Sequence, residues 1–294
     1  MTKTKGIILA GGHGSRLYPL TFGTSKQLLP VYDKPMIYYP LSTLMNAGIR
    51  DILIISTVKD LPRFKDLLND GSNIGINITY KAQKEPRGIA EAFIIGADFI
   101  KNDNVCLILG DNIFYGKNFN LLLEKAILNF ENGFSSIFGV KVDNPNEFGV
   151  IEFDSNNKIN RIIEKPNKIE SNYIVSGLYF YTNNVIKVAN NLTPSERGEL
   201  EITDVNNYYL NEKKLDLFKL DSNFSWLDTG TYNSLIEAAK YFQDLENQTG
   251  EKVACVEEIA LNLGLIDKSK FIETANLMSK SNYGKYLLAK AKNY

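Results

Sequence analysis

The sequence predicts an α/β protein with a doubly wound, Rossmann-like fold built on a mainly parallel central sheet. In the first half, short β-branched apolar runs alternate with amphipathic stretches of helical period, and a glycine-rich loop follows the first run. After Phe148 the pattern changes to hairpin-like strands and then to helix alone. Strand–helix alternation favours parallel strands joined by crossover helices. We therefore expect a parallel sheet, a smaller mixed-strand portion and a set of C-terminal helices.

The two hydrophobic periods place the elements of the first half. Short apolar runs predict strands at 6–10, 51–56, 77–82, 105–109 and 135–142. Apolar residues at helical spacing predict helices at 34–47, 61–68, 88–100 and 119–129. The first of these helices has Asp33 in the N-cap position and Gly48 at its stop.

The second half contains a hairpin and then helices. Segments 148–154 and 159–165 flank an Asn-rich turn, and 173–182 predicts a further strand. From Thr231 onward the pattern is helical, with one helix at 234–245 and three shorter amphipathic pieces. We treat residues 1–294 as one domain whose parts are approximately 1–142, 143–230 and 231–294.

Charge and composition argue against several classes of function. The 33 Lys+Arg and 34 Asp+Glu give a formal net charge of −1, so no broad basic surface for nucleic acid is expected. No stretch approaches the roughly 18 apolar residues of a membrane span, and the N-terminal apolar run is too short for a signal peptide. Cys106 and Cys255 lie in apolar patterns and are expected to be buried thiols. We expect a cytoplasmic protein with no nucleic-acid or membrane partner.

The loop after the first strand carries an anion-binding pattern. Bare glycines are followed by two cations and an amide: Gly11, Gly12, Gly14, Arg16, Lys26 and Gln27. Backbone N–H groups together with fixed cations predict a polyphosphate cradle. A Walker A loop is excluded because it needs Gly-Lys-Ser/Thr, and a dinucleotide fingerprint needs a small residue where Leu17 stands. The alternative is an ordinary glycine-rich turn.

Two aspartates are candidate metal ligands. Ligands of such sheets bind beyond the carboxyl ends of the strands, so the glycine loop and Asp111, which follows the strand at 105–109, should share an edge. Asp228 also lies between an apolar segment and a glycine turn. Mg²⁺ prefers one or two carboxylates together with phosphate oxygens. Alone, each aspartate could be an ordinary turn residue or helix cap. The single histidine, His13, argues against histidine-based proton transfer and, with the failed fingerprint, against a nicotinamide dehydrogenase.

These motifs resemble one known family. GGxGxRLxPLT, then SKQLLP and YDKPMIYYPLSTLMNAGIRDILIIST, resemble the sugar-1-phosphate nucleotidylyltransferases, and the likeness runs from about Lys5 to the C-terminal NYGKYL. The resemblance implies Mg²⁺-dependent attack of glucose 1-phosphate on the α-phosphate of dTTP, giving dTDP-glucose and pyrophosphate. This would be the first step of dTDP-deoxysugar synthesis, for example of dTDP-rhamnose. It also implies a homotetramer that is feedback-inhibited by a dTDP-sugar.

The resemblance also implies roles for individual residues. Arg16 and Lys26 should meet the triphosphate, and the mixed-strand portion should bind the sugar. The sugar phosphate would be held by Lys165 and Arg197, the base by Gln83 and Gly88, the hexose by Gly149, Glu164 and Val175, and the metal by Asp111 and Asp228. The simpler interpretations are purely structural: a solvated turn lysine for Lys165, a residue at the start of a helix for Arg197 and a glutamate on the face of a strand for Glu164.

Three residues depart from the family pattern. Phe148 stands where relatives commonly carry tyrosine, and Arg87 and Glu91 replace an Asp and a Gln. We expect Arg87 to add a cation near the nucleotide. Two alternatives to the implied activity stay open: the same chemistry with UTP or another sugar 1-phosphate, and a non-catalytic nucleotide-sugar sensor. The sensor would be expected to lack one of the phosphate-binding cations or aspartates, and all are present.

Overall fold

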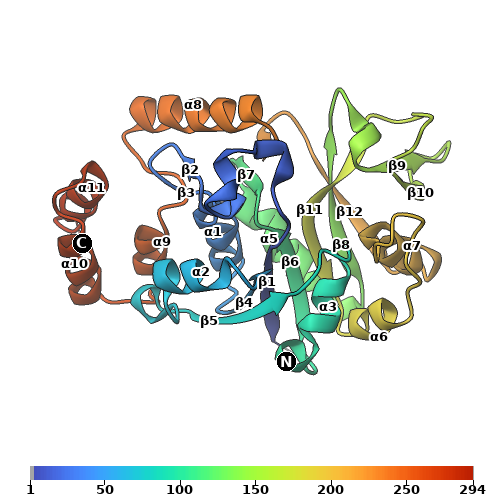
Figure 1. Ribbon diagram of the computed structural model, residues 1–294, viewed down its shortest axis with the longest axis horizontal. Coiled ribbons are helices and arrows are strands. Elements are labelled where there is room, and N and C mark those ends of the chain that lie inside the picture. The colour runs from blue at the N-terminus through green and yellow to red at the C-terminus, as the bar shows by residue number, and fades with distance from the viewer. Residues whose placement is uncertain (1–2, 294) are drawn as a thin grey trace.

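A nine-stranded sheet forms the centre of the computed structural model, which describes residues 3–293 (Figure 1). Its order is β10-β9-β11-β6-β1-β4-β5, with β8 paired to β11 and β12 paired to β8. Strands β6, β1, β4 and β5 are parallel, whereas β11 runs antiparallel to β6 and β8. The predicted doubly wound fold with a mixed-strand portion is thereby confirmed.

Each predicted strand is present within one or two residues of its expected bounds, whereas β12 and the strands of the two small ribbons were not predicted. The sheet consists of β1 (Thr4–Ala10), β4 (Asp51–Thr57), β5 (Asn77–Gln83), β6 (Asn104–Leu109), β8 (Ser135–Lys141), β9 (Gly149–Phe153), β10 (Ile159–Glu164), β11 (Tyr173–Tyr181) and β12 (Leu215–Leu220). Two small ribbons lie beside it, one made of β2 (Pro30–Val31) and β3 (Lys34–Pro35), the other of β7 (Asn112–Gly116) and β13 (Phe224–Asp228).

Helices cover both faces of the sheet. In residues 3–293 they are α1 (Tyr38–Asn46), α2 (Leu61–Leu68), α3 (Glu91–Ile95), α4 (Ala97–Ile100), α5 (Phe119–Leu128), α6 (Val185–Asn190), α7 (Ile202–Asn211), α8 (Tyr232–Thr249), α9 (Val256–Asn262), α10 (Lys268–Leu277) and α11 (Asn282–Lys290). Helices α10 and α11 lie at the end of the molecule opposite the β9–β10 hairpin (Figure 1). Across residues 3–293, every helix is too short or too polar to cross a membrane.

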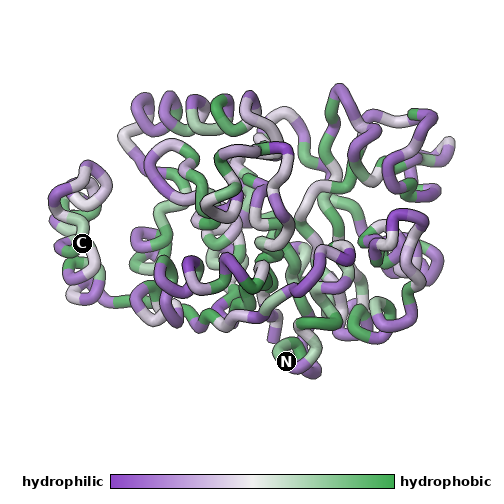
Figure 2. The backbone as a smooth tube through the Cα atoms, viewed as in Figure 1, coloured by the Kyte–Doolittle hydropathy of each residue, from purple (hydrophilic) through white to green (hydrophobic). Residues whose placement is uncertain are grey.

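Alternate residues of β1 build two separate cores, because successive side chains of a strand point to opposite faces. Ile8 belongs to a core that includes residues of α1, α2 and α9, whereas its neighbour Ile7 belongs to a core that includes residues of α3, α6 and α7. A strand covered on both faces is apolar along its whole length, as the sequence of β1 is. Figure 2 shows the hydrophobic segments concentrated in the central strands, whereas the β9–β10 hairpin is more polar. Cys106 and Cys255 are buried free thiols, as predicted.

Two predicted helix boundaries are wrong. Lys34 and Pro35 form β3, and α1 begins only at Tyr38, so Asp33 does not cap a helix. The predicted helix at 88–100 is instead two short helices, α3 and α4, which meet at Gly96. The predicted stop at Gly48 is confirmed, since this glycine has φ of 74° directly after α1.

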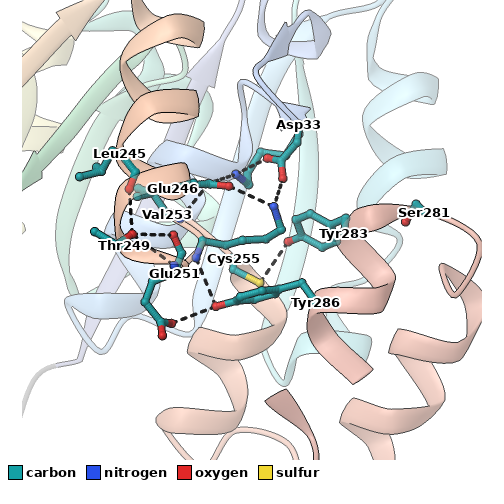
Figure 3. Close-up of polar contacts among 12 residues, drawn as sticks. Asp33, Leu245, Glu246, Thr249, Glu251, Val253, Cys255, Ser281, Tyr283 and Tyr286 are labelled. Carbon is teal, nitrogen blue, oxygen red and sulfur yellow. Dashed lines mark hydrogen bonds and ion pairs between the residues drawn. The ribbon is translucent and has the colours of Figure 1, made fainter. Parts of the chain in front are cut away.

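A buried ionic network explains where Asp33 goes instead and attaches α8 to the N-terminal part. Lys34, with 1% of its side chain exposed, lies 2.5 Å from Asp33 and 3.0 Å from Glu246 of α8. Lys252 contacts the same two carboxylates, and Figure 3 shows Asp33 and Glu246 converging beside Tyr283. Since an unpaired buried charge is strongly unfavourable, this network specifies how α8 docks.

We expect Glu246→Ala to lower the free energy of unfolding by about 3 kcal/mol or more, because it leaves Lys34 with only Asp33 as a partner. Asp244→Ala is the matched control on the same helix, since Asp244 forms an exposed ion pair with Lys240 and should cost less than about 1 kcal/mol. Urea denaturation of both variants measures the difference. Equal losses would contradict the role given to the network.

Candidate active site

The candidate site lies at the carboxyl edge of β1 and β6. These strands are parallel with Leu9 opposite Leu109, so the glycine loop and Asp111 leave the sheet at the same edge, as predicted. The β7–β13 ribbon then pairs Asp228 with Asn112, the residue after Asp111. Thr229 reinforces this approach by donating a hydrogen bond from its hydroxyl to the carbonyl oxygen of Asp111 at 3.0 Å. Two aspartates far apart in sequence thus lie together.

Three adjoining cavities open at this edge, and Asp111 lines all of them. The amide cavity, about 230 Å³, is lined by Gly11, Gly12, Gln27, Gln83 and Gly88 among others. The glycine cavity, about 210 Å³, is lined by Gly11, Gly14, Arg16, Lys26 and Gln27. The carboxylate cavity, about 220 Å³, is lined by Arg16, Gly149, Glu164, Lys165, Val175, Arg197 and Asp228. The structure therefore brings every predicted site residue to one of three connected cavities.

Two glycines at this edge adopt backbone conformations that are unfavourable for other residues. Gly14 has φ of 58° and turns the chain into the short 3₁₀ helix Ser15–Leu17. Gly88 has φ of 98°, and its backbone lies directly against that of Leu200. Such left-handed conformations are strained for residues with a side chain. His13 is exposed in the same loop and lines none of the three cavities, so the structure gives no reason to assign it chemistry.

Buried charges at the centre of the site are unequally compensated. Burial alone would raise the pKa of Asp111. Nζ of Lys26 lies 2.7 Å from one oxygen of this carboxylate, and Asn112 donates a hydrogen bond to the other. Together they hold the pKa of Asp111 below its usual value. Burial and the neighbouring negative charge of Asp111 raise the pKa of Asp228 to about 6. Lys26 and Arg16 offset this only in part. The two carboxylates are therefore close enough to repel each other.

Carboxylates hold the arginines of the site in place. Arg16 pairs with Glu147 at 3.1 Å, and both side chains are largely exposed. Arg197 contacts Glu201 at 2.9 Å and Glu164 at 3.2 Å. Sequence reasoning missed Glu147 and Glu201. Arg197 and Glu201 both precede α7, where a spacing of four residues predicts no contact, so nothing in the sequence pointed to Glu201 or to Glu147.

Lys165 differs from the arginines because it forms no ion pair with any residue from 3 to 293. It follows β10, has φ of 43° and lines the carboxylate cavity. A left-handed non-glycine residue at a functional site often marks strain that the surrounding structure maintains. Glu164, the preceding residue, accepts a hydrogen bond from the Thr203 hydroxyl at 2.5 Å and so is fixed in the same cavity.

The three departures from the family pattern have local explanations. Phe148 packs edge-on against Trp226 with ring centroids 5.6 Å apart, and the two rings line the carboxylate cavity. Arg87 does not offer a free cation to the amide cavity, contrary to expectation, because its Nε donates to Glu91 at 2.8 Å. The two substituted residues therefore pair with each other, Arg87 reaching from the loop before α3 to Glu91, the first residue of that helix.

We expect Asp228→Asn to stabilise the metal-free protein at pH 8 by roughly 1–3 kcal/mol, since one pKa unit is worth about 1.4 kcal/mol. In the wild type the folded state keeps its Asp228 proton to about pH 6, whereas an ordinary aspartate loses it near 3.8. Wild-type stability therefore falls as pH rises through this window. The gain from the variant should accordingly shrink below pH 6 and vanish near pH 4.

The measurement is urea denaturation in a chelator at pH 4, 6 and 8. Asp244→Asn, which changes an exposed carboxylate of α8, is the control and should show no such trend. Destabilisation by Asp228→Asn at pH 8 would contradict the repulsion between the two carboxylates.

Comparisons with known proteins identify the family of this chain. Residues 5–244 match the model of the family described as nucleotidyl transferase. A protein of Neisseria meningitidis named glucose-1-phosphate thymidylyltransferase is 54% identical, covering 97% of this chain and 98% of the relative. One of the same name from Mycobacterium tuberculosis H37Rv is 51% identical, covering 97% and 98%.

Solved structures share the fold. A Bacillus anthracis protein assigned as a glucose-1-phosphate thymidylyltransferase, crystallised with sucrose, superposes with a TM-score of 0.75 and 40% identity over 82% of this chain and 96% of that one. A UDP-glucose pyrophosphorylase complexed with UDP-glucose has a TM-score of 0.73 at 24% identity, over 83% of this chain and 100% of that one, and so shows the fold alone.

Proposed function

The chain belongs to the nucleotidyl transferase family, and we propose that it converts glucose 1-phosphate and dTTP into dTDP-glucose and pyrophosphate. The observation that carries the proposal is the set of three cavities joined at Asp111. One has an amide and bare backbone for a base, one has glycines and cations for phosphates, and one has carboxylates and cations for a sugar phosphate. A nucleotide sugar has these three parts.

In the proposed reaction an oxygen of the sugar phosphate attacks the α-phosphorus of dTTP, and the bond from that phosphorus to the pyrophosphate oxygen breaks. The attacking oxygen is already ionised at neutral pH, so no general base is needed. The protein's part is to bring two polyanions together and to stabilise the developing charge. Arg16 and Lys26 would face the phosphates of dTTP in the glycine cavity.

The carboxylate cavity supplies the groups that the sugar phosphate needs. Glu164 can accept hydrogen bonds from sugar hydroxyls, and Gly149 and Val175 shape the same wall. Lys165 and Arg197 would hold the phosphate. Since Arg197 already contacts Glu164 and Glu201, its guanidinium is positioned before substrate binds.

Asp111 and Asp228 fit a divalent cation, which we propose is Mg²⁺. Their mutual repulsion, expressed in the raised pKa of Asp228, would be relieved by a cation held between them. Among residues 3–293 no group of three or more His, Cys, Asp or Glu side chains could hold a metal, so phosphate oxygens and water would complete the coordination. When bound, the cation would neutralise charge on the reacting phosphates.

We also propose, from the resemblance, that the chain forms a homotetramer in the cytoplasm and is inhibited by a dTDP-sugar made later in the pathway. Light scattering measures the number of subunits in the assembly. Inhibition is measured by adding dTDP-rhamnose to the enzyme assay.

The test of the activity is pyrophosphate release from purified protein with Mg²⁺ and glucose 1-phosphate, offering dTTP, UTP, CTP, ATP and GTP in parallel. We expect the highest kcat/KM with dTTP. A thymine methyl and a 2′-hydroxyl are small groups whose discrimination is worth about 1–3 kcal/mol, so UTP should be a slower substrate. Release with none of the five, by protein that still binds dTTP, would favour the non-catalytic sensor.

We expect Arg16→Ala to lower kcat by about 10³, with a much smaller change in KM for dTTP, because its guanidinium should stabilise charge that develops during transfer. Arg63→Ala is the matched control, since Arg63 pairs with Asp60 and lines none of the three cavities. Steady-state pyrophosphate release measures both variants. An effect of Arg16→Ala on KM alone would remove Arg16 from the transition state.

A further inference from the structure

The amide of Gln83 in the amide cavity is held by a single carboxylate. Gln83 ends β5, and only 6% of the residue is exposed. Its Nε2 donates to Oε2 of Glu91 at 2.8 Å and lies 3.5 Å from the carbonyl oxygen of Gly88. Both neighbours can only accept hydrogen bonds. The NH₂ group of Gln83 must therefore face them.

The other end of the amide is thereby turned into the cavity. Oε1 of Gln83 lies so close to the backbone of Gly11 that a Cβ there would be 2.6 Å from it. Within residues 3–293, the hydrogen bonds of the Gln83 side chain are both made by Nε2, and no donor reaches Oε1. Gln83 thus presents to a ligand an acceptor with an unused lone pair.

The orientation of Glu91 is set in turn by Arg87. Nε of Arg87 donates to Oε1 of Glu91 at 2.8 Å, and a second guanidinium nitrogen contacts the same oxygen. This leaves Oε2 for Gln83. The Glu91 side chain is 6% exposed and that of Arg87 is 64% exposed, so a surface cation compensates a buried carboxylate. Without that partner the buried charge would be strongly unfavourable.

We infer that the Arg87–Glu91 ion pair fixes the Gln83 amide with its oxygen toward the base, so that the site selects pyrimidines whose N3 carries a hydrogen. Thymine and uracil donate from N3, whereas N3 of cytosine is an acceptor and would face another acceptor. Glu91 is thus a positioning residue for base selection. The inference deepens the proposed function, because it rests on the amide cavity receiving the base.

The inference is tested by one variant that should reverse the orientation of the Gln83 amide and a second that should restore it. In Glu91→Gln, Arg87 should bind the carbonyl oxygen of the new amide and leave its NH₂ facing Gln83. Gln83 must then turn its own oxygen toward that NH₂ and present Nε2 to the base, which suits cytosine. Adding Arg87→Asp supplies an acceptor for the new NH₂, turns the new carbonyl toward Gln83 and restores the original orientation.

The measurement is the dissociation constant of dTTP and of CTP, by calorimetry, for wild type, Glu91→Gln and Arg87→Asp/Glu91→Gln. We expect wild type to prefer dTTP. The single variant should reduce the dTTP-to-CTP preference by about tenfold or more, and the double variant should recover most of it. Asp244→Asn, which breaks the exposed i, i+4 pair with Lys240 on α8, is the control and should leave the preference unchanged.

The outcomes separate this inference from the activity, because binding needs no turnover. A wild-type protein that releases pyrophosphate with dTTP, together with an unchanged preference in Glu91→Gln, would overturn the inference and leave the function intact. The predicted reversal and restoration in a protein that releases no pyrophosphate would support the inference and contradict the function. If Glu91→Gln lowered the affinity for dTTP and for CTP equally, and the double variant did not recover it, Glu91 would merely shape the cavity. That result would overturn the inference.

Discussion

The site depends on the partly buried contact between Lys26 and Asp111, whose charged atoms lie 2.7 Å apart. Removing either charge from water without its partner would be strongly unfavourable, so the contact holds the loop after β1 against the end of β6. The β7–β13 ribbon then adds Asp228 beside them, and Lys26 cannot compensate both carboxylates. The resulting surplus of negative charge, next to a loop suited to phosphates, is the constraint that makes a divalent cation chemically fitting at this edge.

Ion pairs with carboxylates also position other cations of the molecule, although Lys165 has no such partner among residues 3–293. Arg197 is held by Glu164 and Glu201, and Arg87 by Glu91, before any ligand is present. Groups fixed in this way need little reorganisation when charge develops, which is how electrostatic preorganisation favours a transition state. Lys34, which lines none of the three cavities, attaches α8 by the same kind of ion pair. Ion pairing therefore serves both the architecture and the site.

Local sequence patterns predicted every strand of the central sheet except β12, and the edge at which the site lies, because those features follow from hydrophobic period and chain direction. They failed at Asp33, where contacts with Lys34 and the distant Lys252 outweigh the local capping signal. Motifs located the residues that line the cavities. The motifs could not show that Arg87 and Glu91 form an ion pair with each other. That pairing depends on where α3 begins and on the contact of Glu91 with the amide of Gln83.

The most direct test of the account is a crystal structure with Mn²⁺ and a non-hydrolysable dTTP analogue, in which anomalous scattering locates the metal. We predict a Mn²⁺ ion coordinated by the carboxylates of Asp111 and Asp228 and by phosphate oxygens in the glycine cavity. A metal bound by phosphate oxygens alone, remote from both aspartates, would contradict the central claim that this pair of carboxylates organises the site.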